Sequence, residues 1–61
     1  MEYTDFYKKC IDYQIAKHSN NPYWQTEEQV VENMGGVEAI NGLYSLACCV
    51  SEEQRIKVLG F

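Results

Sequence analysis

The sequence VEAINGLYSLACCV, residues 37–50, is the most apolar stretch of the chain and carries a single charge, Glu38. At helical spacing its polar residues form only a narrow strip, while its apolar residues widen into one stripe: Val37, Ala39, Ile40, Leu43, Tyr44, Leu46, Ala47, Cys48 and Val50. A helix that is apolar around most of its circumference is a buried helix. At ~1.5 Å per residue it is too short to cross a membrane. We therefore expect a central core helix with the other segments packed around it.

The chain of 61 residues is expected to form one domain, residues 1–61. A domain of this size buries only about 60% of the surface of its unfolded chain and usually needs disulfides, a metal or a partner subunit. Cys10, Cys48 and Cys49 form no Cys-x-x-Cys pair, and the one histidine, His18, is far from two of them in sequence. We expect the cysteines to be small core hydrophobes in a reducing cytoplasm, with no metal and no cofactor. Association with a second copy remains as the way to bury more surface, so the sequence predicts a homodimer.

The net charge of −4 is concentrated in residues 23–61, where six glutamates face only Arg55 and Lys57. An acidic surface repels phosphate, so nucleic acid is disfavoured as a partner and a basic protein surface is favoured. The N-terminal sequence MEYTDFYKK has no apolar signal-peptide run, so we expect a cytoplasmic protein without a membrane partner.

Residues 4–19 are predicted to form the first helix, with Thr4 as N-cap. One broad face of this helix is apolar and rich in aromatic residues: Tyr3, Phe6, Tyr7, Cys10, Ile11 and Tyr13. This face either packs on the central helix or supplies part of a partner surface, because tyrosine combines apolar area with a polar tip. Trp24, beside the only proline, either covers the core or anchors a partner.

Two capping-box patterns predict helix starts, Thr26 with Gln29 and Ser51 with Gln54. The pair Gly35-Gly36 predicts the end of the helix that Thr26 begins. Ser51 favours a break after the central helix, although one continuous helix over residues 37–59 is the alternative. No alternating strand pattern is present. The fold is therefore predicted to be all-α, a small bundle of three to four helices.

No pattern of residues predicts catalysis. The adjacent pairs Glu27-Glu28 and Glu52-Glu53 fall in first helical turns, where the helix dipole favours a negative charge. His18 falls near the end of a helix, where a cation is favoured. We predict a protein that is not an enzyme and has no catalytic residue.

The segment MGGVEAINGL, residues 34–43, resembles the opening of a Cro- or YdaS-type helix-turn-helix. That resemblance implies a DNA-binding regulator, in which a recognition helix presents polar and basic side chains to the major groove. Here residues 44–50 continue apolar, and the next helix offers Arg55 and Lys57 beside Glu52 and Glu53. DNA binding is therefore the alternative function.

In its size, helical pattern and general character the whole chain resembles the small early accessory proteins encoded between the exonuclease and excisionase genes of lambdoid phages. This resemblance implies a small helical protein, sometimes dimeric, that influences host physiology or the choice between lytic and lysogenic growth. It transfers no site residues.

The leading prediction is a non-enzymatic, homodimeric protein-interaction module that also binds a host protein in the host cytoplasm. The residues predicted to supply contact area are the apolar face of the first helix and the tryptophan: Phe6, Tyr7, Cys10, Ile11, Tyr13 and Trp24.

Overall fold

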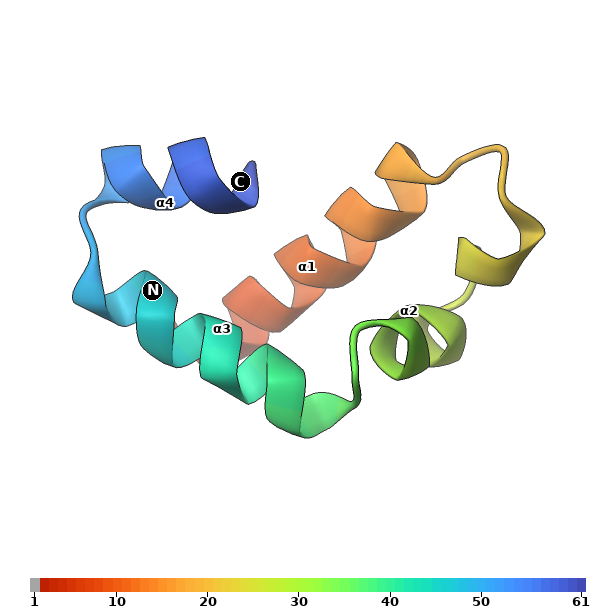
Figure 1. The fold of residues 1–61 in the computed structure, drawn as a ribbon, viewed down its shortest axis with the longest axis horizontal. Helices are drawn as coiled ribbons and strands as arrows, with labels where there is room; N and C mark the ends of the chain where they lie inside the picture. Colours follow the sequence, from red (N-terminus) through yellow and green to blue (C-terminus); the bar gives the residue numbers. More distant parts are fainter. Residues whose placement is uncertain (1) are drawn as a thin grey trace.

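A computed structural model describes residues 2–61, which contain four α-helices and one short 3-10 helix. The elements are α1 (Tyr3–Lys17), η1 (Pro22–Trp24), α2 (Glu27–Asn33), α3 (Val37–Cys49) and α4 (Glu52–Leu59). The described residues form no strand, so the all-α prediction is confirmed. In Figure 1 the axes of the two longest helices, α1 and α3, are inclined to each other and not parallel. The short α2 lies near the start of α3, and α4 folds back beside the other end of α3.

The first helix begins one residue earlier than predicted and ends two residues earlier. Its N-cap is Glu2, whose side chain makes no capping hydrogen bond. The Phe6 amide donates to the Glu2 carbonyl over 3.0 Å, so Thr4 already lies inside the first turn. The prediction of Thr4 as N-cap is therefore wrong, because a threonine near a helix start does not decide by itself which turn is the first.

Both ends of α2 follow the predicted patterns. The Gln29 amide donates to the Thr26 hydroxyl over 3.2 Å, and the Gln29 side-chain oxygen accepts from the Thr26 amide over 3.1 Å, which completes the capping box. At the other end of α2, the Gly36 amide donates a hydrogen bond to the Val31 carbonyl oxygen, and the Gly35 amide donates one to the Glu32 carbonyl oxygen. Both glycines have positive φ, and this pair of bonds is a Schellman motif, which ends the helix.

The break between α3 and α4 is confirmed, and the continuous helix over residues 37–59 is excluded. Val50 has extended backbone angles, φ −117° and ψ 162°, which stop α3 after Cys49. The Ser51 hydroxyl then accepts from the Gln54 amide over 3.2 Å and starts α4.

The hydrophobic core lies between α1 and α3, and the fully buried side chains come from three helices: Phe6 and Cys10 of α1, Val30 of α2 and Ile40 of α3. Phe6 and Cys10 are fully buried and pack with Ile40 and Ala47 of α3. On α3 only Ile40 and Ala47 are buried, so the prediction of a central helix buried around most of its circumference is wrong. In a chain this short, the remaining helices are too few to surround a 13-residue helix.

Aromatic rings join α1 to both α3 and the segment after α4. The Tyr44 ring of α3 lies 5.2 Å from the Tyr3 ring and 5.4 Å from the Phe6 ring. The Phe61 ring lies 5.6 Å from Phe6 and 5.3 Å from Tyr13. Phe61 therefore brings the end of α4 against α1, as the position of the C label in Figure 1 shows.

Gly60→Ala is expected to destabilise the fold by about 1–2 kcal/mol, because a side chain at positive φ is strained. Gly60 has φ +90°, and an added Cβ would lie 2.5 Å from the Tyr13 hydroxyl oxygen. The matched control is Gly42→Ala, in the middle of α3, where an added Cβ meets no atom within 4 Å. That control should gain roughly 0.5–1 kcal/mol, since glycine weakens a helix interior. Thermal unfolding compares the two variants, and equal effects would contradict the assigned turn at Gly60.

Candidate interaction surface

An apolar groove runs between α3 and α4. It has a volume of about 170 Å³, and its lining surface is apolar. We call it the α3–α4 groove, and it is lined by Leu43, Leu46, Ala47, Val50, Arg55, Val58 and Leu59. Ala47 is its buried residue, whereas Leu46 and Val58 are 62% and 81% exposed. Large aliphatic side chains that gather at one exposed place mark an interaction surface more often than scattered ones do.

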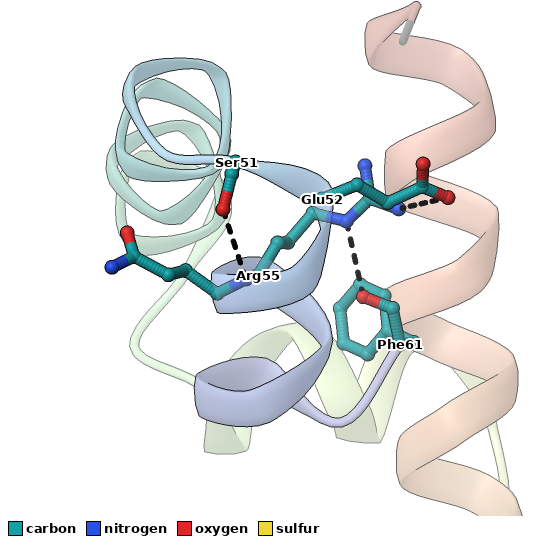
Figure 2. A network of polar contacts seen from close by, with 5 residues as sticks. Ser51, Glu52, Arg55 and Phe61 are labelled. Atoms are coloured by element: carbon teal, nitrogen blue, oxygen red, sulfur yellow. Dashed lines mark hydrogen bonds and ion pairs between the residues drawn. The ribbon is translucent and has the colours of Figure 1, made fainter.

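Arg55, which lines the groove, makes polar contacts with residues at both ends of the α4 segment. Arg55, whose side chain is 13% exposed, donates from Nε to the Phe61 carbonyl oxygen over 3.2 Å. Its guanidinium also lies 3.9 Å from the Glu52 carboxylate. Figure 2 shows the Arg55 side chain extended between these two partners. Arg55 therefore lines the groove beside Val58 and Leu59 of the same helix, while its guanidinium is engaged with these two partners.

Three of the six predicted contact residues are enclosed within the fold. Phe6 and Cys10 are 0% exposed and Ile11 is 6% exposed. They belong to the core, so in this structure they offer no surface to a partner. This agrees with the simpler interpretation of the first helix, in which its apolar face packs on residues 37–50.

The other three predicted residues are half-buried and lie apart from the α3–α4 groove. The partial burial of Tyr7 and the nearby Glu27 carboxylate raise the pKa of its phenol. Tyr13 packs on Phe61. Trp24 stacks on His18, with ring centroids 4.2 Å apart. The structure therefore does not bring the predicted residues together into one exposed surface.

The cysteines divide into one buried and two exposed residues. Cys10 is enclosed, and this burial raises the pKa of its thiol to about 11. Cys48 and Cys49 are exposed, so the prediction that all three are core residues is wrong for this pair. Cys48 makes a hydrogen bond with Tyr44 that raises the pKa of the phenol, and partial burial of Tyr44 adds to the rise.

A polar thiol reagent is expected to modify two cysteines rapidly in the native protein and the third only on unfolding. The thiolate is the reactive form, and Cys10 is both enclosed and held protonated at neutral pH. Mass spectrometry after a short exposure should therefore find the reagent on Cys48 and Cys49. The control is a Cys48→Ser, Cys49→Ser double variant, which should show no rapid modification. Rapid modification of Cys10 would contradict the packing of α1.

Two more open hollows carry charged side chains. One, of about 720 Å³, is lined by Tyr7, Thr26, Glu27, Glu28, Val31 and Glu32. The other, of about 430 Å³, is lined by Lys9, Tyr44, Ala47, Cys48, Val50, Glu52 and Arg55.

Within residues 2–61 no three acidic, cysteine or histidine side chains are grouped so that they could hold a metal ion. In the same residues no helix is both long and apolar enough to span a bilayer.

The sequence identified residues of the α3–α4 groove as apolar, but it predicted that they are buried and so did not indicate an exposed surface. The apolar stripe of residues 37–50 contains Leu43, Leu46 and Val50. The signal that could have indicated exposure was the shortage of other apolar segments able to cover so wide a stripe.

Comparisons of this chain with models of protein families, with curated proteins and with solved structures give no match.

Proposed function

We propose that this chain is a non-enzymatic helical protein-interaction module that works as a homodimer. One observation carries the proposal: large apolar side chains near the groove are exposed. They are Leu46 on α3, Val50 just after α3 and Val58 on α4. The described core is small, with six buried apolar residues. Association with a second protein surface would bury these side chains and supplement that core.

The biological setting of the proposal comes from the resemblance to small early accessory proteins of lambdoid phages. In that setting the dimer binds a host protein in the host cytoplasm and modulates host physiology or lytic and lysogenic development. The net charge of −4 supports a partner with a basic surface.

Sedimentation equilibrium across micromolar concentrations tests the homodimer. We expect a concentration-dependent mass between that of one chain and that of two. A folded chain whose mass stays at 7.1 kDa over the whole range would contradict the dimer.

A helix-turn-helix DNA-binding regulator is the second candidate, because α3 is followed by a two-residue break and a further helix, α4. The first turn of α4 carries Glu52 and Glu53, which would meet the phosphate backbone unfavourably. We therefore rank it second. An electrophoretic mobility-shift assay at low salt separates the two candidates, since a DNA-binding protein retards even non-specific duplex under those conditions.

A further inference from the structure

The hollow of about 430 Å³ brings a thiol and two cationic side chains from three different helices together. The thiol belongs to Cys48, which is exposed in the last turn of α3. Lys9 lines the same hollow from α1, and Arg55 lines it from α4. We call it the Cys48 hollow. The next residue, Cys49, is also exposed but does not line it. The fold therefore gives two neighbouring cysteines different surroundings.

We propose that Cys48 is a modification site, at which the thiol exchanges with glutathione disulfide, an anion that the Cys48 hollow recognises through its cations. In this step the Cys48 thiolate attacks one sulfur of the disulfide. A bond forms between Cys48 Sγ and that sulfur, and the original S–S bond breaks. The released glutathione thiolate takes up, through water, the proton that Cys48 gave up. The disulfide is itself the oxidant, and the product is a mixed disulfide on Cys48.

The charges that line the Cys48 hollow favour an anion, although the chain as a whole is acidic. Lys9 and Arg55 are its cations, and Glu52 is its carboxylate. The Glu52 side chain is 79% exposed and lies 3.9 Å from the guanidinium of Arg55. Within residues 2–61 no carboxylate pairs with Lys9. Lys9 is therefore the charge that can receive a carboxylate of glutathione, which has more carboxylates than ammonium groups.

The size and position of the Cys48 hollow also fit this modification. Sites for small molecules have volumes of about 300–1,000 Å³, and this hollow has about 430 Å³. Ala47 and Val50 line both this hollow and the α3–α4 groove. A glutathione group on Cys48 would therefore stand at the edge of the groove and place carboxylates beside its apolar residues. The inference goes beyond the proposed homodimer and does not depend on it.

Cys49 is an internal control for the recognition of glutathione disulfide. Both cysteines are exposed, and both lie in the last turn of α3, where the helix dipole disfavours a thiolate. Exposure and helix position therefore treat the two thiols alike. A preference for Cys48 that depends on the charge of the reagent comes from the hollow.

The experiment exposes the reduced natural chain to glutathione disulfide and follows the adducts on Cys48 and Cys49 by peptide mass spectrometry. We expect Cys48 to react roughly threefold faster than Cys49, the effect of one exposed charge near the reacting group. Cystamine, a disulfide with cationic ends, undergoes the same exchange and should show no preference for Cys48. Added salt should reduce the preference seen with glutathione disulfide, because it screens the charge of Lys9.

Lys9→Gln tests whether the hollow causes the preference. This variant should react with glutathione disulfide at equal rates on Cys48 and Cys49. Lys8→Gln is the matched control, because Lys8 is the neighbouring lysine of α1 and does not line the hollow. It should keep the preference of the natural chain. Both lysines are exposed, so both variants should keep their helical circular dichroism.

Three results would overturn the proposal. They are equal rates at Cys48 and Cys49 in the natural chain, a preference for Cys48 that persists in Lys9→Gln, and a preference that Lys8→Gln lowers as much as Lys9→Gln does. None of these results bears on the homodimer, which sedimentation tests separately.

Discussion

Phe6→Ala is expected to leave most of the chain unfolded. Phe6 is fully buried, and its ring lies 5.4 Å from Tyr44 of α3 and 5.6 Å from Phe61 after α4. It therefore joins three separate parts of the chain. Removing a buried phenylalanine ring costs ~3–5 kcal/mol. At ~0.05–0.15 kcal/mol per residue, the entire stability of a domain this small is of similar size.

Urea unfolding followed by circular dichroism measures the effect of Phe6→Ala. The control is Val37→Ala, a change at a side chain that is 50% exposed, which should alter the free energy of unfolding by no more than about 0.5 kcal/mol. If Phe6→Ala lowered the free energy of unfolding by less than about 1 kcal/mol, the contacts of Phe6 with Tyr44 and Phe61 would not be the centre of the core, contrary to the structure.

Phe61→Ala is expected to release α4 while the other three helices stay folded. None of the residues of α4 is buried. Phe61 instead packs on Phe6 and Tyr13, and its carbonyl accepts a hydrogen bond from Arg55. Without the Phe61 ring, α4 should open locally at low cost, as elements with few buried contacts do.

Hydrogen exchange of individual amides tests the release of α4. For Phe61→Ala we expect exchange in residues 55–59 to quicken by roughly 30-fold, the factor for about 2 kcal/mol, with little change in α1. Ile56→Ala is the control, because Ile56 lies on the same helix and is 49% exposed. Equal acceleration in α1, α3 and α4 would show instead that the whole chain unfolds as one unit. Since α4 forms one wall of the α3–α4 groove, the same variant should also weaken the proposed dimer.

Helix boundaries that depend on neighbouring residues were predictable from the sequence. The Thr26–Gln29 box, the Gly35-Gly36 stop and the Ser51 start all involve bonds between residues three to five positions apart. Such bonds form within one stretch of chain, so the local residues specify them. Thr4 was misassigned because its neighbours suit a helix start and a helix first turn equally well.

The placement of the candidate site was not predictable in the same way. Phe6, Cys10 and Ile11 and the residues Leu46 and Val50 all belong to apolar stripes of similar appearance. The first three became core and the last two became surface because α3 and α2 pack against α1. A stripe indicates that a face is apolar, but which segment covers it depends on contacts between distant residues.

The order of residues alone was enough to specify an all-helical chain, the break at Ser51 and the absence of strands in residues 2–61, since these follow from spacing and capping within short segments. Only the packing of the helices decided that Cys10 is enclosed while Cys48 and Cys49 face solvent, and that α3 and α4 leave a groove between them. The physical reason is the limited length of the chain. Four short helices cannot cover every apolar face, and the three-dimensional arrangement determines which one remains open.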